Sequence, residues 1–261
     1  MKKVLFTTMI LNLFSCNSQS KQTQEQKNQS VKANTTEKLA SVNYNLILEN
    51  KEINGIKIEL LEIGTLNVPS GKIVVCDPLV FYQPTPYTKM VPPGKYPMKI
   101  YVAKTEDSGD RYAIAQLEIS TKKAVKWILA VTENDNVNEL QEKDAFFGFP
   151  VDTGLAGFFD YQTSLAFDKF QNDFYKQEPA KNIYDDYFEA EFKKNSVPKD
   201  NPNAVGNWIN YTLPQTNLNI AMFQSGYGDG YYPAYWGIDE NGTVTSLVLD
   251  FFVIDLPSIN N

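Results

Sequence analysis

The sequence predicts an α+β fold: mainly antiparallel β-sheet, sandwich-like or strongly curved, with two inserted helices. Three observations support this prediction. Short segments that alternate polar and apolar residues follow one another between turn signals, an Asn-Gly pair at 241–242 marks a hairpin, and two later stretches carry aromatic residues at helical spacing. Hydrophobic residues make up 43% of the 261 residues, which is enough for a sizeable core.

The strands are expected mainly in the first half of the folded body and at its C-terminal end. Short turns join the alternating segments 96–102, 111–119 and 125–131, so these three are predicted to form an antiparallel meander. Further strands are expected over 44–66, 72–76 and 218–224, the first of these being one strand or two. The proline-containing stretches 83–93 and 195–208 are expected to be loops.

The hairpin after residue 234 is predicted to hold the most buried strand. Its second strand, 243–254, has apolar residues on both faces, which is typical of a central strand covered on both sides. Asp250 stands among these buried neighbours, so it needs a cation, several N–H donors or its own proton. Arg111, the only arginine in the chain, is one candidate for that cation.

Two helices are predicted between the strands. Asp160 is a suitable N-cap for a helix over 161–176, in which Ala166, Phe170 and Phe174 fall on one stripe. A second helix is expected over 182–194, where aromatic residues repeat every four positions.

The N-terminus resembles a bacterial lipoprotein signal. Lys2 and Lys3 precede a short apolar stretch that ends at Cys16, which such a signal would lipidate. We therefore expect a signal peptide over 1–15, a disordered tether over 16–42 and a single globular β-rich domain over 43–261, attached to the cell envelope through the lipid anchor. The alternative is an uncleaved start that leads into a disordered cytosolic tail.

Composition excludes several classes of function. The chain has no histidine, which removes the usual Ser-His-Asp and Cys-His catalysis and histidine-based metal sites. Beyond Cys16 only Cys76 remains, in an apolar run where a small buried hydrophobe is expected. A net charge of −7 argues against nucleic acid and against direct binding to anionic lipid heads. The sequence predicts neither a cofactor nor a metal site.

The candidate site residues gather around a glycine-rich loop. In the segment 225–230 three glycines alternate with other residues, and such glycines allow a backbone path that other residues do not. Four aspartates lie at strand ends or glycine turns, two aromatic residues follow the loop, and the single arginine is a possible partner. These candidates are Asp77, Arg111, Asp152, Asp229, Tyr232, Trp236 and Asp250. A structural role in turns and core is the competing interpretation for each of them.

Several motifs follow one another in a distinctive order. They are Ser70-Gly71 to Asp77-Pro78, 91–97, 111–117 with Trp127, 148–154, and 225–230 with Tyr232-Pro233 and Tyr235-Trp236-Gly237. This order resembles a bacterial family known as domain of unknown function 4241 (DUF4241), and the likeness covers roughly residue 45 to the C-terminus. The resemblance implies no established chemistry, only a loose association of some members with toxin–immunity neighbourhoods.

Two functional hypotheses follow. The first is a non-catalytic binding module on the envelope, for which an immunity-like role is one option and whose partner is a protein or a glycan. An acidic body suits a basic protein partner. The second is a hydrolase or lyase that acts on an envelope or glycan substrate through two carboxylates. Whether the protein is an enzyme stays open at this point. An open pocket in which Asp152, Asp229 and Asp250 meet would favour the second hypothesis.

Overall fold

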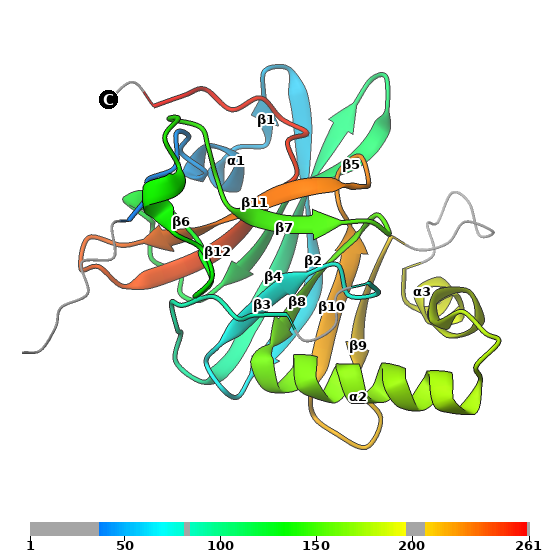
Figure 1. The fold of residues 1–261 in the computed structure, drawn as a ribbon. Coiled ribbons are helices and arrows are strands. Elements are labelled where there is room, and N and C mark those ends of the chain that lie inside the picture. Colours follow the sequence, from blue (N-terminus) through cyan, green and yellow to red (C-terminus); the bar gives the residue numbers. More distant parts are fainter. Residues whose placement is uncertain (1–36, 81–83, 197–206, 260–261) are drawn as a thin grey trace, which may run out of the picture. The chain divides into compact units, whose positions relative to one another are not determined.

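The computed structural model describes residues 37–80, 84–196 and 207–259, which belong to a compact unit that runs from Thr36 to Asn261 (Figure 1). The predicted signal peptide, Cys16 and most of the tether lie outside the described residues. Residues 37–42, the end of the predicted tether, contact the folded body. The backbone N–H of Ala40 donates to the carbonyl of Trp127 (2.9 Å), and Val42 bridges to Ser258.

The fold is mainly antiparallel β-sheet with few helices, as predicted, and its larger sheet is strongly curved. The larger sheet has the strand order β1-β2-β4-β5-β12-β11-β6, and β7 also pairs with β11. These strands are β1 (Glu52–Ile53), β2 (Ile56–Val68), β4 (Gly94–Thr105), β5 (Gly109–Glu118), β6 (Lys126–Leu129), β7 (Gly148–Val151), β11 (Gly230–Ile238) and β12 (Val244–Asp250). The smaller sheet has the order β3-β8-β10-β9, with β3 (Ile73–Cys76), β8 (Leu155–Asp160), β9 (Trp208–Thr212) and β10 (Asn219–Gln224).

The main core lies between the two sheets. Phe158 of β8 and Phe223 of β10 are fully buried and pack against each other, and Phe223 also packs against Phe251, which follows β12. The larger sheet contributes buried residues such as Trp236 and Leu249 to the same cluster. As predicted, β12 is a central strand, because it pairs with β5 on one side and β11 on the other.

The helices cover the other face of the smaller sheet (Figure 1). Helix α2 (Tyr161–Gln177) begins where the sequence predicts, since the Asp160 side chain accepts a hydrogen bond from the backbone N–H of Gln162 (2.8 Å). The second predicted helix is a π-helical turn, η2 (Tyr184–Phe188), that continues into α3 (Glu189–Ser196). Cys76 is buried in the cluster beneath these helices, as expected of a small hydrophobe, and burial raises the pKa of its thiol.

Several expectations about the strands are wrong. Only β4 and β5 of the predicted meander are neighbours, because the β11–β12 hairpin lies between β5 and β6. The start of the predicted strand 44–66 is a short helix, α1 (Asn45–Glu49), and 137–139 forms a 3₁₀ turn, η1 (Val137–Glu139). Strands β7 and β8 were not predicted, and β9 begins at the end of a stretch expected to be a loop.

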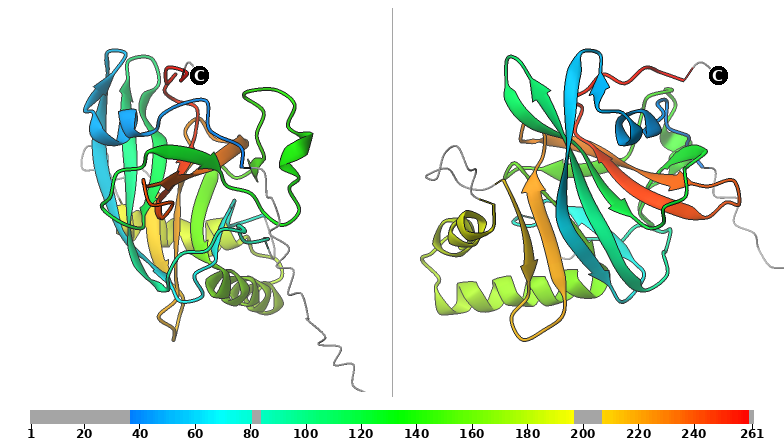
Figure 2. Two further views of the ribbon diagram at one scale, coloured as in Figure 1. Left: turned by 90° about the vertical axis from the view of Figure 1, so that its left-hand side faces the viewer. Right: turned by 180° about the vertical axis from the view of Figure 1, so that it is seen from behind.

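Three asparagines join the two sheets along β2. The side-chain oxygen of Asn219 accepts a hydrogen bond from the backbone N–H of Asn67 (2.8 Å), and its amide donates to the carbonyl of Thr65 (2.8 Å). The Asn210 amide donates to the carbonyl of Ile63 (3.2 Å) at a bulge in β2. Figure 2 shows β9 and β10 beside β2. These bonds satisfy backbone groups of β2 at and just beyond the bulge.

Gly64 at this bulge should be intolerant of any side chain. Its φ is +90°, and a Cβ atom there would lie 2.7 Å from the Asn210 amide nitrogen. We expect Gly64→Ala to lower the free energy of unfolding by about 3 kcal/mol, through left-handed strain plus the disturbed asparagine contacts. The matched control is Gly55→Ala, where φ is +81° but no atom lies within 4 Å. The free energy of unfolding of Gly55→Ala should be only about 1 kcal/mol below that of the wild type. Equal losses in urea unfolding would refute the role of the asparagine contacts.

Candidate functional site

Asp77 is a buried carboxylate that holds the loop 152–154 against the chain just after β3, and we call this arrangement the junction. It follows β3 and is fully buried. Its carboxylate accepts hydrogen bonds from the backbone N–H groups of Asp152 (2.9 Å), Thr153 (2.7 Å) and Leu79 (3.0 Å), and from the Thr153 hydroxyl (2.8 Å). These donors compensate the loss of hydration and hold the loop 152–154 against the end of β3. A carboxylate with this set of donors is suited to structure rather than to proton transfer.

The glycine loop, residues 225–230, is fastened to the same junction. The Asp229 carboxylate accepts a hydrogen bond from the backbone N–H of Gly154 (3.0 Å), and the carbonyl of Gly154 accepts one from the backbone N–H of Ser225 (3.1 Å). Gly226 has φ +51°, and a Cβ atom there would lie 2.8 Å from Cβ of Phe251. Asp229 itself is exposed, as is Asp152, whose backbone N–H but not its side chain takes part in the junction.

Tyr232 and Trp236, the two aromatic candidates, are core residues on one face of β11. Tyr232 is 6% exposed, and its hydroxyl donates to the carbonyl of Gly228 (2.9 Å), which ties the glycine loop to the strand. Trp236 is 1% exposed and packs edge-on against Tyr87. Neither ring is available to a ligand, because Tyr232 holds the glycine loop and Trp236 belongs to the core of the larger sheet.

Asp250 is buried at a different place in the fold, beneath the end of β12. It accepts hydrogen bonds from the Tyr44 hydroxyl (2.9 Å) and from the backbone N–H of Phe252 (2.9 Å). Burial raises the pKa of this carboxyl to about 6, and the two hydrogen bonds only partly oppose that shift.

Arg111 does not pair with Asp250, so that sequence-based alternative is wrong. Its guanidinium lies over the ring of Tyr227 in the glycine loop, 5.7 Å from the ring centroid. It also donates from Nη1 to the carbonyl of Asp110 (3.1 Å). Arg111 therefore buttresses the glycine loop through a cation–π contact.

The structure does not bring the candidate carboxylates together. Asp152 and Asp229 both belong to the junction, but Asp250 lies apart with Tyr44. Among the residues that the structure describes, no group of three or more aspartates, glutamates, cysteines or histidines is placed to hold a metal ion. The arrangement that would favour a carboxylate enzyme is thus not formed by these three residues.

The sequence analysis missed an aromatic face beside the glycine loop, formed by Phe146, Tyr231 and Phe252. Tyr231 is 47% exposed and Phe252 is 51% exposed. The Phe146 ring stacks on Tyr231 and also contacts Phe252, with centroid distances of 5.7 Å in both cases. The Tyr231 hydroxyl accepts a hydrogen bond from the backbone N–H of Gly148 (2.9 Å), so this ring is fixed against β7.

Phe252 is held in an unfavourable backbone conformation. Its φ is +55°, in the left-handed region that phenylalanine rarely adopts. The Asp250 carboxylate stabilises this conformation by accepting the Phe252 backbone N–H two residues later. The predicted candidate Asp250 therefore contributes to the aromatic face indirectly. A periodicity analysis gives no signal for it, because left-handed geometry at a non-glycine residue leaves no pattern in sequence.

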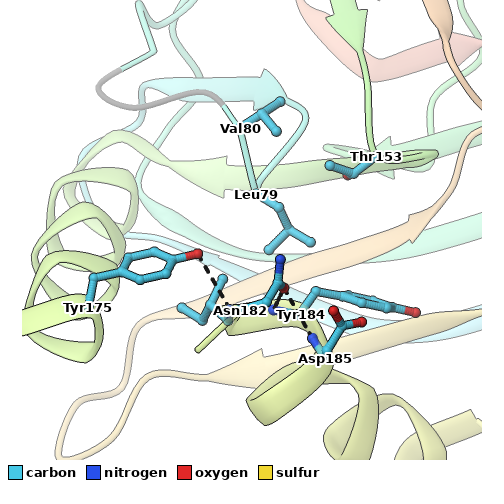
Figure 3. Close-up of a pocket in the computed structure, with 8 residues that line it drawn as sticks. Leu79, Val80, Thr153, Tyr175, Asn182, Tyr184 and Asp185 are labelled. Atoms are coloured by element: carbon cyan, nitrogen blue, oxygen red, sulfur yellow. Dashed lines mark hydrogen bonds between the residues drawn. The ribbon is translucent and has the colours of Figure 1, made fainter. Parts of the chain in front are cut away.

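A small pocket of about 250 Å³ lies next to the junction, and Leu79 and Thr153 of the junction help to line it. It lies between the loop after β3, the loop 152–154, the end of α2 and the start of η2 (Figure 3). Leu79, Val80, Thr153, Tyr175, Asn182, Ile183, Tyr184 and Asp185 line it. Since Leu79 and Thr153 both donate backbone hydrogen bonds to Asp77, the buried carboxylate sets one wall of this pocket.

Comparison with known proteins gives one match. The family model described as a protein of unknown function (DUF4241) matches residues 66–249, which is more than half of the chain. No curated protein and no solved structure matches the chain significantly.

The junction predicts that Asp77 and Asp229 differ strongly in their effect on stability. Asp77→Asn replaces one acceptor oxygen by an amide NH2 group, which is itself a donor and would face buried N–H donors. We expect the free energy of unfolding to fall by about 3 kcal/mol. Asp229→Asn keeps an acceptor for Gly154 at an exposed site, so the free energy of unfolding should change by less than about 1 kcal/mol. Urea unfolding measures both, and similar effects would show that Asp77 does not anchor the loops.

Asp250 predicts an unusual dependence of stability on pH. Its carboxyl binds a proton more tightly in the folded protein, with a pKa near 6 against an ordinary value of 3.8. Its favourable contribution is therefore complete below about pH 4 and is lost as pH rises through 6. Asp250→Asn removes this titration, so the variant should gain about 2 kcal/mol relative to wild type between pH 4 and pH 7.

Urea unfolding of Asp250→Asn and wild type at several pH values measures this gain. The control is Asp255→Asn, the same change of side chain at an exposed position. A pH-independent difference for Asp250→Asn, or one of opposite sign, would rule out the proposed protonation.

Proposed function

The chain belongs to the DUF4241 family, and since that family carries no assigned activity, we propose from the site itself that the protein is a membrane-anchored envelope lipoprotein whose folded body is a non-catalytic binding module. The body engages a protein partner through the aromatic face of Phe146, Tyr231 and Phe252. An immunity-like role, in which the partner is neutralised by binding alone, fits this proposal.

The anchor is proposed from the sequence. Lys2 and Lys3, the short apolar stretch behind them and Cys16 support a lipid anchor on the outer side of a bacterial membrane. Within the described ranges, no helix has both the length and the apolar character needed to cross a bilayer.

The observation that carries the binding proposal is the exposed and strained Phe252. Left-handed backbone at phenylalanine costs about 1–2 kcal/mol, and half of its side chain remains in water. Strain of this kind often marks functional positions, because folding alone would favour Gly or Asn there. Exposed aromatic rings are the residues most enriched at the centres of protein interfaces.

The aromatic face is also prepared for binding without rearrangement. Tyr231 is fixed through its hydroxyl and through the pairing of β11 with β7, and Phe252 is fixed by the buried Asp250. Fixed side chains lose less conformational entropy when a partner binds. The net charge of −7 additionally favours a basic partner through electrostatic steering.

The alternative is a carboxylate-dependent hydrolase or lyase with an envelope or glycan substrate. Its candidate residues have other tasks: Asp77 anchors a loop, Asp229 binds Gly154, and Asp250 fixes Phe252. Only the raised pKa of Asp250 is a property expected of a general acid, and this side chain is buried. The binding module therefore accounts for more of the structure.

Cross-linking in the native envelope tests the proposal. Tyr231 is replaced by a photo-cross-linking phenylalanine analogue in the full-length protein, and adducts are identified by mass spectrometry. We expect a discrete protein adduct that disappears when Phe252→Asn is added. Asn tolerates left-handed backbone, so this change should alter the free energy of unfolding by less than about 1 kcal/mol. The same analogue at Leu165, which is 45% exposed on α2, is the positional control.

The outcomes separate the hypotheses. An adduct that persists with Phe252→Asn, or that forms equally at position 165, would reject the aromatic face as the binding surface. An adduct with glycan instead of protein would replace the protein partner by a carbohydrate one.

A further inference from the structure

The pocket of Figure 3 has a chemical character that points to a particular kind of ligand. Leu79, Val80 and Ile183 contribute apolar surface to it. Two tyrosine rings, Tyr175 and Tyr184, contribute aromatic surface. Asp185 is the only charged residue among those that line it.

Asp185 is exposed at the mouth of the pocket, and it differs from the charged residues around it because no protein partner uses its carboxylate. The neighbouring Asp186 accepts the backbone N–H of Asn182 (2.8 Å) and so serves as a local cap. The nearby lysines are paired elsewhere, Lys181 with Glu178 (3.2 Å) and Lys193 with Glu189 (2.7 Å). Among the described residues, the Asp185 side chain has no ion pair and accepts no hydrogen bond.

The second polar group at the pocket is the amide of Asn182. Its oxygen accepts the backbone N–H groups of Tyr184 (2.8 Å) and Asp185 (3.2 Å), which fixes the start of η2 beside the pocket. In Figure 3, Leu79, Val80 and Thr153 lie on one side of the pocket, and Asn182, Tyr184 and Asp185 on the other. The carboxylate is therefore presented from a fixed turn.

Negative charge outweighs positive charge around Tyr184 at the pocket. The pKa of the Tyr184 hydroxyl is raised, mainly by burial and further by the negative charges of Glu189 and Asp185, while the positive charge of Lys193 partly opposes this shift. An anionic ligand would be repelled here, and a neutral polar one would leave the carboxylate unpaired. A cation would be attracted both by Asp185 and by the faces of the tyrosine rings.

The volume limits the size of the ligand. About 250 Å³ is less than the roughly 300–1,000 Å³ of pockets that bind drug-sized molecules. A volume of this size suits a short alkyl chain with one charged end better than an oligosaccharide. Such a ligand would place its methylene groups against Leu79 and Ile183 and its charge at Asp185.

We propose that this pocket binds an alkyl cation, the ammonium or guanidinium group carried by a short methylene chain. Both a lysine or arginine side chain of another protein and a free small amine have this chemistry. None of the eight lining residues belongs to the aromatic face, so the proposal stands or falls independently of the binding function proposed above.

Methyl NMR of the full chain in detergent micelles tests this, because Leu79, Val80 and Ile183 report directly from the pocket. The probe is n-butylguanidinium, and n-butylurea is the neutral isostere. We expect saturable shifts of these methyl groups with a dissociation constant of about 1 mM for the cation. The urea should bind at least fivefold more weakly.

Asp185→Asn should weaken n-butylguanidinium binding at least fivefold while leaving the methyl spectrum of the core unchanged. Asp255→Asn removes one charge from another exposed position and should leave the affinity within twofold, which controls for net charge. Equal shifts with the urea, no saturable shifts, or full affinity in Asp185→Asn would overturn the proposal.

A capped tripeptide, acetyl-Gly-Arg-Gly-amide, distinguishes the two sources of the cation. Affinity equal to or greater than that of n-butylguanidinium supports a protein side chain as the natural ligand. Exclusion of the tripeptide, with n-butylguanidinium still bound, supports a free amine. Phe252→Asn should affect neither titration, so a failure of the aromatic face and a failure of this pocket would be recognised separately.

Discussion

The buried carboxylate of Asp77 is the interaction on which the arrangement of the loops depends. A fully buried charge is tolerable only where donors surround it, and here the donors come from the chain just after β3 and from the loop 152–154. The next residue, Gly154, binds Asp229 and Ser225 of the glycine loop. One carboxylate thus fixes a wall of the pocket and, through Gly154, the entry into β11.

A second buried carboxylate, Asp250, destabilises the folded protein when it is charged. Asp250 has fewer donors than Asp77, and its raised pKa shows that the charged form is not fully compensated. Its carboxylate stabilises the left-handed backbone of Phe252, a residue that is strained and half exposed. Two unfavourable features that support one exposed ring are easier to explain by binding than by folding. The proposed binding function follows from this comparison.

Local patterns in the sequence predicted those elements that depend on neighbouring residues. The Asn-Gly hairpin, the Asp160 cap of α2 and the doubly buried β12 all follow from spacing within a few positions. The prediction of a three-stranded meander is wrong because strand order depends on pairing between distant segments. No residue near β6 in the sequence indicates that β11 lies beside it. The glycine loop and its aspartates were identified, but their roles depend on partners such as Thr153 and Gly154, which periodicity does not connect.

If Phe146, Tyr231 and Phe252 form the binding surface proposed above, a partner covers this aromatic face in cells. Hydroxyl-radical footprinting of intact cells and of the purified full-length protein measures this directly. Met90, 54% exposed, provides an internal reference. The account predicts that Tyr231 and Phe252 are oxidised several-fold more slowly in cells than in the purified protein, relative to Met90. Equal oxidation rates for both rings in the two preparations would contradict it.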